Sequence, residues 1–358
     1  MKLKANTILN IVPIFCVLVS SLIYAKGPNF ELVTKTSTIK LNHLIVKDTN
    51  SARSIAKSYD YSDLSKVREQ NEEYISKMLH DKKFFSNGKR KVVAYAGMHY
   101  DAQRKPEIKE MISRLKDLGA NCYSYLIDDS PEEDLALLPE FCELASKEGI
   151  EVWVVLVPPT EEPGRPGTPD SLRYPPFGLN YVKWAKQISE ISSQHNNLRL
   201  FMIDDFAYNL KKFTLAYTSK IFSALKSQNK KILFGVTYYE DQLGKTKLDL
   251  SKYKPYIEAV EWGFQANSKF DTDYGQSAKS LSINIKDFRN AFPNNLLIPC
   301  IYFNANSSWK RKPTSGYLKN AMYIAYKEAG VALIFRTPDA GTENYLIIKN
   351  FCKENLRR

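Results

Sequence analysis

Residues 119–159 read GANCYSYLIDDSPEEDLALLPEFCELASKEGIEVWVVLVPP and contain one repeat of the pattern that decides the fold. Two runs rich in apolar, β-branched and aromatic residues, 121–127 and 152–157, have the length and composition of buried strands. Between them, apolar residues recur at helical spacing over Leu135–Ala145. Gly149 precedes the second run, where a helix that returns to a parallel sheet commonly ends. The stretch therefore predicts a strand–helix–strand unit.

The same alternation extends in both directions and covers the chain from residue 91 onward. Apolar runs predict eight strands, at Val92–Met98, Asn121–Ile127, Val152–Val157, Leu198–Ile203, Ile232–Thr237, Ala259–Phe264, Leu296–Phe303 and Val331–Phe335. Amphipathic stretches predict helices at Ile108–Leu118, Leu135–Ala145, Tyr181–Ile191, Phe213–Leu225, Ala278–Phe288, Tyr317–Tyr326 and Tyr345–Phe351, with the weakest helical pattern at Leu243–Ile257. Gly119 and Gly330, like Gly149, stand shortly before strands, where a helix C-cap belongs.

This count of elements indicates the fold class. Eight strands linked by helices, with a final helix, are typical of an α/β fold of the (β/α)8 TIM-barrel type. A doubly wound open sheet is the alternative. It usually carries a Gly-rich turn after its first strand, and Gly97–Asp101 (Gly-Met-His-Tyr-Asp) is not such a turn. We therefore predict a barrel.

Residues 1–25 are typical of a secretory signal peptide. Lys2 and Lys4 precede a mainly apolar stretch, and Ala25 supplies a small residue at the expected cleavage point. An uncleaved membrane anchor is the less favoured alternative, because the stretch is short for a span and contains Pro13. We expect a secreted or periplasmic protein with no stable membrane span once the signal is removed.

The segment 26–90 differs from the rest of the chain in its weak periodicity. It contains a short strand-like run at Ile39–Val46 and a polar helical pattern at Asp63–Met78. We predict that it forms an N-terminal extension to a barrel domain that spans residues 91–358.

The composition is that of an ordinary globular protein, with 44% apolar and 25% charged residues in a chain of 358. The formal net charge is +12, from 51 basic and 39 acidic residues, and the densest basic run is Lys82–Lys91. A basic excess indicates either an acidic polymer as partner or a solvated, lysine-rich surface. No helix-turn-helix or zinc-knuckle motif accompanies the basic run, so we expect no nucleic-acid partner.

Histidine and cysteine usage limits the metal and redox chemistry. The four His residues form no H-x-H or H-E-x-x-H motif, so we expect neither a metal centre nor another cofactor. Cys122 and Cys300 lie in apolar strand-like runs and are expected to be small buried hydrophobes. Pairing of the four cysteines outside residues 1–25 is the alternative for an exported protein.

A (β/α)8 barrel places its active site at the C-terminal ends of its strands. The residues in or just after the predicted strands that we expect at this site are His99, Tyr125, Asp128, Asp204, Asp205, Tyr238, Glu240, Trp262, Asn304 and Arg336. Aromatic rings stack on sugar faces, amides bind hydroxyl groups and paired acids transfer protons. The set lacks a phosphate clamp, and the chain has no G-x-S-x-G motif. It therefore indicates a carbohydrate cleft.

Asp204 and Asp205 are the sharpest feature of this set. They follow directly on the apolar strand that ends at Ile203. Adjacent carboxylates in a partly apolar site repel each other, so one of them should have a raised pKa and act as an acid near neutral pH. The structural alternative is that one Asp caps the next helix while the other pairs with an Arg.

The aromatic members of the set depend on the strand register. Side chains alternate between the two faces of a strand, so an error of one residue replaces each inward residue by its neighbour. Trp262 is the most sensitive, because Glu261 beside it would then face inward as a candidate acid.

The order of motifs resembles a known family. Asn121–Asp129 ends in paired Asp after Tyr-Ser-Tyr, Val152–Pro159 ends in Pro-Pro, and Phe201–Phe206 contains Asp-Asp. This order is similar to that of the TIM-barrel β-N-acetylglucosaminidases that include the O-GlcNAcases and the bacterial hyaluronidase-type enzymes. The resemblance implies that Asp204 orients and polarises the 2-acetamido group of the substrate. It also implies that Asp205 is the general acid/base.

The resemblance covers about residues 91–240 and has one clear departure. Leu126-Ile127 stands where the family carries Pro-Lys, so the lysine that contacts substrate is missing. An ordinary double-displacement barrel glycosidase would instead carry Asn-Glu after strand four and Glu after strand seven. Glu161 or Glu240 could supply the second carboxylate of an inverting scheme.

These features predict a glycoside hydrolase that acts on a poly- or oligosaccharide with the Asp pair as its acids. Substrate assistance on an N-acetylhexosaminide is one form of this prediction. Two alternatives stay open. One is a catalytically silent barrel that binds glycans through aromatic residues. The other is a lyase or binder of an anionic polymer, which the basic charge suggests.

Overall fold

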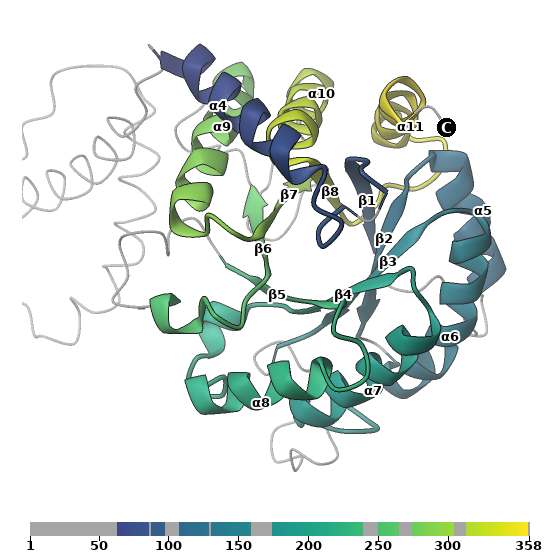
Figure 1. Ribbon diagram of the computed structural model, residues 1–358. Coiled ribbons are helices and arrows are strands. Elements are labelled where there is room, and N and C mark those ends of the chain that lie inside the picture. The colour runs from purple at the N-terminus through teal and green to yellow at the C-terminus, as the bar shows by residue number, and fades with distance from the viewer. Residues whose placement is uncertain are drawn as a thin grey trace, which may run out of the picture. The chain divides into compact units, whose positions relative to one another are not determined.

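The computed structural model describes residues 63–85, 87–96, 107–128, 130–158, 174–238, 250–264, 274–303 and 313–356. One compact unit extends from Tyr59 to Arg358 (Figure 1). The expected signal peptide and the strand-like run Ile39–Val46 lie outside the described residues. Among the helices that are described, none has the length and apolar character needed to cross a membrane.

Eight parallel strands form a closed barrel in sequence order, as the sequence predicted. They are β1 (Lys91–Ala96), β2 (Cys122–Ile127), β3 (Glu151–Leu156), β4 (Leu198–Ile203), β5 (Leu233–Thr237), β6 (Ala259–Phe264), β7 (Leu296–Tyr302) and β8 (Val331–Phe335). The barrel closes between β1 and β8, where Val93 pairs with Leu333. The strand bounds of β4, β6 and β8 agree with the predicted bounds to the residue.

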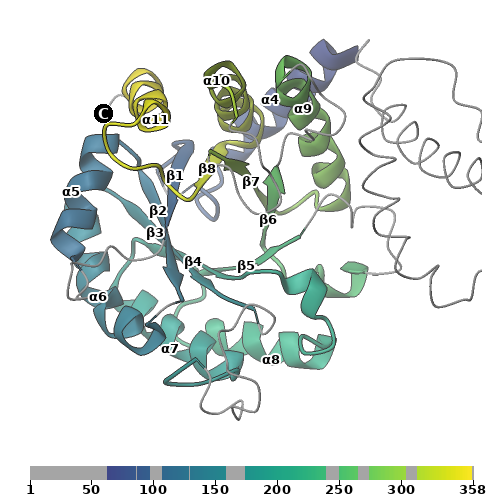
Figure 2. The same ribbon diagram turned by 180° about the vertical axis from the view of Figure 1, so that it is seen from behind.

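Helices surround the barrel on its outside (Figures 1 and 2). They are α4 (Leu64–Met78), α5 (Ile108–Leu118), α6 (Pro131–Lys147), α7 (Tyr181–Gln194), α8 (Leu215–Leu225), α9 (Tyr274–Ala291), α10 (Ser315–Ile324) and α11 (Glu343–Asn355). Short 3-10 helices η2 (Phe206–Asn209) and η4 (Leu250–Tyr253) and a π-helix η5 (Ala325–Ala329) complete the described elements. The polar helix expected in the extension is α4, which packs against α9 and η5.

Three glycines end helices or lead into strands in a backbone conformation that favours glycine. Gly119, Gly149 and Gly330 have φ angles of 78°, 70° and 76°, as their predicted cap positions require. Gly330 has a second constraint, because a Cβ built on it would lie 2.8 Å from Phe85 and 2.9 Å from Ile75. Ile75 of α4 and Phe85 therefore pack closely against the backbone at Gly330, just before β8.

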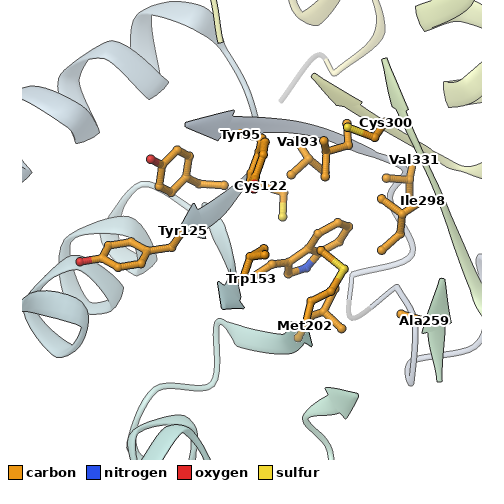
Figure 3. Packing of buried hydrophobic residues seen from close by; sticks show 14 of the residues in the cluster. Val93, Tyr95, Cys122, Tyr125, Trp153, Met202, Ala259, Ile298, Cys300 and Val331 are labelled. Carbon is orange, nitrogen blue, oxygen red and sulfur yellow. The ribbon is translucent and has the colours of Figure 1, made fainter. Parts of the chain in front are cut away.

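The barrel interior is filled by alternate residues of the strands. In Figure 3, Cys122, Trp153 and Met202 point into the middle of the barrel, whereas Tyr125 points the opposite way, toward a helix. Near the start of the strands, the buried Lys91 ammonium pairs with Glu151 at 3.1 Å. Trp153 Nε1 donates to the same carboxylate at 2.9 Å. These partners satisfy the buried charges, as a low-dielectric interior requires.

The four described cysteines, Cys122, Cys142, Cys300 and Cys352, are buried free thiols. The prediction that Cys122 and Cys300 are small buried hydrophobes is thus confirmed, and no described pair forms a disulfide. Burial raises the pKa of both Cys142 and Cys352 to about 12. The thiols therefore stay protonated at ordinary pH.

Candidate active site

The Asp pair lies where β4 ends at the C-terminal face of the barrel. Asp204 continues the pairing of β4 with β3, because its N–H donates to the Leu156 carbonyl at 3.0 Å. Asp205 then turns the chain with φ 44°, in the left-handed region that Asp tolerates better than most residues. Its N–H donates to Asp204 Oδ1 at 2.8 Å, so the two residues are held in one local arrangement.

Asp205 precedes η2 but does not cap it with its side chain. No side-chain capping hydrogen bond is made by Asp205, and its carbonyl accepts instead from Tyr208 N and Asn209 Nδ2 at 3.1 and 2.9 Å. The capping role considered as the structural alternative is therefore absent. Backbone outliers of this kind cluster at functional sites, which favours a chemical role for Asp205.

The surroundings of Asp204 raise its pKa to about 6. Burial is the largest cause, followed by the charge of Asp205, with a smaller contribution from Asp128. The Thr237 hydroxyl and the hydrogen bond from the Asp205 N–H oppose the shift but do not cancel it. A carboxyl group with this pKa is mostly ionised at pH 7, so Asp204 can hold a negative charge next to a reacting group.

Glu261 adds a buried carboxyl group to this cluster. It lies on β6, in register with Thr237 of β5 and Ile298 of β7. Burial, and then the charge of Asp204, raise its pKa to about 8, and a contact with Cys300 opposes the shift. Glu261 is therefore protonated at neutral pH. The sequence had offered it only through the register alternative at Trp262.

The orientation of Glu261 follows from its neighbours on the same face of β6. A Cβ on Gly235 would lie 3.3 Å from the Ala259 Cβ and 3.0 Å from Leu200, so Ala259 faces the barrel interior. Glu261 is two residues further along and shares that face. The odd-numbered residues of β6 thus point inward, and Trp262 points outward.

The prediction that three aromatic residues line the cleft is wrong. Trp262 is fully buried and stacks on Phe288 of α9, with ring centroids 4.1 Å apart. Tyr238 packs against Phe288 and Phe292, at 6.1 and 5.6 Å.

Tyr125 is the third of these residues. Its hydroxyl donates to the Asp134 carbonyl of α6 at 2.7 Å, and its ring packs on Phe141. All three side chains therefore fill the layer between the strands and the helices, because they occupy the outward phase of their strands.

Other aromatic residues occupy the inward phase near the C-terminal end. The Tyr302 and Phe335 ring centroids are 4.5 Å apart, and those of Tyr95 and Phe335 are 5.4 Å apart. The Tyr302 ring lies against Gly263, where a Cβ would approach it to 3.0 Å. These rings come from β1, β7 and β8, whereas the Asp pair follows β4. Val93 on β1 and Cys300 on β7 precede Tyr95 and Tyr302 by two residues, so each pair lies on the same face of its strand.

Of the remaining residues that the sequence predicted at the site, the structure describes two and leaves three outside the described residues. Asp128, at the end of β2, lies near enough for its charge to act on Asp204, and its N–H donates to Asp134 Oδ2 at 3.2 Å. Arg336 is exposed after β8, with φ 52° and its guanidinium 5.4 Å from the Phe335 ring centroid. His99, Glu240 and Asn304 lie outside the described residues.

The described residues thus bring together Asp128, Asp204, Asp205 and Glu261 at one end of the barrel. Within the parts of the chain that are described, no group of three or more His, Cys, Asp or Glu residues is arranged to hold a metal ion. What the arrangement offers is proton transfer and a negative charge held at a partly buried position.

Comparisons with known proteins agree on the fold. No protein-family model matches the chain, and no curated protein matches its sequence. Among solved structures, a GH113 β-1,4-mannanase is similar with a TM-score of 0.51 and 10% identity, covering 74% of this chain and 99% of its own. The endoglucanase Cel5A of Pseudomonas stutzeri gives a TM-score of 0.51 and 10% identity, covering 75% of this chain and 94% of its own.

A β-D-glucuronidase from Dictyoglomus thermophilum is similar over part of its length. Its TM-score is 0.52 at 12% identity, and the match covers 74% of this chain and 50% of that protein. At such low identity the likeness extends to the backbone architecture and no further. The comparisons and the closed strand order together establish that the protein adopts the (β/α)8 TIM-barrel fold.

Proposed function

We propose that the protein is a glycoside hydrolase that acts on a poly- or oligosaccharide with the Asp pair as its acids. The observation that carries the proposal is the position and pKa of Asp204, which follows β4 beside Asp205 and has a pKa raised to about 6. The β-1,4-mannanase and the endoglucanase share this barrel architecture and are named for acting on polysaccharides, which supports the proposal.

In this mechanism the two carboxyl groups have different roles. Asp205 protonates the glycosidic oxygen as the bond to the leaving sugar breaks, and then takes a proton from the incoming water. Asp204 is largely ionised at pH 7 and stabilises the positive charge that develops on the sugar ring. On an N-acetylhexosaminide, Asp204 orients the 2-acetamido group, whose carbonyl oxygen attacks the anomeric carbon in place of an enzyme nucleophile.

Export is part of the same proposal. A polysaccharide substrate lies outside the cytoplasm in most settings, and residues 1–25 have the pattern of a signal peptide. Cleavage after Ala25 gives a mature chain that begins at Lys26. N-terminal sequencing of the exported protein tests this point, and a chain that still begins at Met1 contradicts it.

The catalytic test is the substitution Asp205→Asn, assayed by release of reducing sugar from a panel that includes N-acetylhexosamine oligomers. We expect kcat to fall by about 10²–10⁴-fold, the usual contribution of general acid catalysis. Asn also tolerates the left-handed backbone that Asp205 adopts, so the free energy of unfolding should change little.

Asp63→Asn is the matched control, because Asp63 is exposed and precedes α4 on the outside of the barrel. It should leave kcat unchanged. If Asp205→Asn unfolds the protein while the remaining folded fraction keeps full activity, the Asp pair is structural and the proposal fails.

A catalytically silent glycan-binding barrel is the second candidate. It is favoured by the rings of Tyr95, Tyr302 and Phe335, which lie together on the inward face near the C-terminal end. Tight binding of an oligosaccharide that stays intact over long incubation would support this candidate. Release of product that depends on Asp205 would exclude it.

A further inference from the structure

An open groove of about 620 Å³ lies where the connections that follow β3 and β4 lead into α7 and α8. One wall comes from the connection between β3 and α7, and the other from the connection between β4 and α8. The second connection begins with the Asp pair and later carries Lys212, so one short segment supplies both the proposed acids and a wall of the groove.

The walls of the groove are fixed by packing and hydrogen bonds. The Phe177 ring packs edge-on against Trp184, with centroids 5.1 Å apart, and Trp184 Nε1 donates to the Gly178 carbonyl at 2.9 Å. Across the groove, the Tyr217 hydroxyl accepts from the N–H of Tyr181 at 2.9 Å. These contacts hold an aromatic ring on each side, which is how sugar-binding surfaces are commonly built.

The charge of the groove has a single sign. Lys183 and Lys212 line it, and the described lining residues include no Asp or Glu. Neither lysine forms an ion pair with any residue that the structure describes. Lys226 at the far end of α8 shows the contrast, since its ammonium pairs with Glu258 at 2.6 Å. Among the described residues the groove thus presents two cations without a carboxylate partner, and an anionic ligand can supply the counter-charge.

We propose that this groove is a subsite for a negatively charged sugar. Lys183 and Lys212 engage the carboxylate or sulfate group of the sugar, and Phe177 and Tyr217 contact its ring. The net charge of +12, which becomes +10 when Lys2 and Lys4 are removed with residues 1–25, favours the approach of an anionic polymer to the molecule. The claim that the groove is a subsite for a substrate rests on the proposed hydrolase function. The claim that it binds an acidic glycan does not depend on that function.

The test is binding measured by calorimetry with three oligosaccharides of equal length: a uronic-acid oligomer, a sulfated oligomer and a neutral oligomer. We expect an acidic oligomer to bind more tightly than the neutral one, and the tighter of the two acidic probes identifies the anion. The double variant Lys183→Gln/Lys212→Gln should weaken that binding about tenfold, since exposed ion pairs contribute up to about 1 kcal/mol each.

Lys186→Gln/Lys211→Gln is the matched control. It removes the same total charge from exposed lysines of the same two elements, neither of which lines the groove. This control should bind the acidic oligomer almost as tightly as the unchanged protein. An equal loss in both double variants would overturn the proposal, because the attraction would then be a general field of the surface. The proposal would also be overturned if a single-stranded oligonucleotide of equal charge bound more tightly than the acidic oligomer and lost that binding in the Lys183→Gln/Lys212→Gln variant.

Activity assays separate this proposal from the proposed function. If no glycan is hydrolysed but the groove lysines govern acidic-oligomer binding, the proposed hydrolase function fails and the binding site stands. If hydrolysis depends on Asp205 but the groove variant binds and turns over acidic and neutral oligomers like the unchanged protein, the subsite fails and the hydrolase function stands.

Discussion

Glu261 is a residue at which burial and charge repulsion act together. Its pKa is raised from 4.5 to about 8, so the folded protein holds a proton that the unfolded chain releases between these pH values. Its contribution to stability is therefore complete below about pH 4.5 and is lost as the pH rises through about 8. Asp204 acts in the same direction between 3.8 and about 6.

The substitution Glu261→Gln should remove most of this dependence. We expect the free energy of unfolding to fall less between pH 5 and pH 9 in the variant, by a few kcal/mol, since one pKa unit corresponds to about 1.4 kcal/mol. Urea unfolding at the two pH values measures the difference. The exposed Glu190→Gln is the control and should follow the unchanged protein. A Glu261→Gln variant that does the same would show that the carboxyl group is not buried in its protonated form.

Some of these residues were predictable from the sequence and others were not. Asp204 and Asp205 were, because two charged residues interrupt an apolar run at the end of a strand. The sequence alone could not show which of Glu261 and Trp262 points inward, because β6 is buried on both faces and its composition does not reveal the phase of alternation. Only the neighbours of β6 in the barrel determine which of the two points inward.

At the scale of elements, glycines at helix ends are required for two different reasons: a positive φ angle, and a lack of space for a Cβ atom. Gly330 and Gly149 both have positive φ, but a Cβ on Gly330 meets Phe85 and Ile75 within 3.0 Å, whereas a Cβ on Gly149 meets nothing within 4 Å. Gly149→Ala should cost about 1–2 kcal/mol, from the backbone conformation alone. Gly330→Ala should cost several kcal/mol, because overpacking adds to it. Chemical denaturation of the two variants checks the order, and equal losses would contradict the close packing of α4.

The predicted elements agree best with the structure where the pattern is strongest. The predicted strand bounds agree well with the structure because charged or polar residues flank the apolar runs. The helix expected at Tyr317–Tyr326 instead ends as α10 at Ile324 and continues as η5. The π-helix places Glu328 against α4 and α9, where its carboxylate accepts from Asn71 and Ser282, each at 2.9 Å. Partners more than 40 residues away cannot be seen in a local periodicity.

At the scale of the whole molecule, the barrel includes part of its N-terminal extension. The Glu328 carboxylate is buried and pairs with Arg68 of α4 at 3.2 Å, and Ile75 and Phe85 are almost fully buried. A chain that starts at Tyr59 keeps these contacts. A chain that starts at Lys91 should be several kcal/mol less stable than that chain, because the buried Glu328 carboxylate loses Arg68 and Asn71. Equal stability of the two shortened chains would show that α4 is dispensable.

The buried thiols have a practical consequence for following motion in this barrel. Cys122, Cys142, Cys300 and Cys352 lie on β2, α6, β7 and α11, and each is shielded from solvent. A thiol-specific reagent reaches such a group only when the surrounding element opens. The labelling rate of each cysteine, read by mass spectrometry of its peptide, therefore reports the free energy of local opening at that point. The native chain thus contains its own set of probes for ranking which parts of the barrel open first.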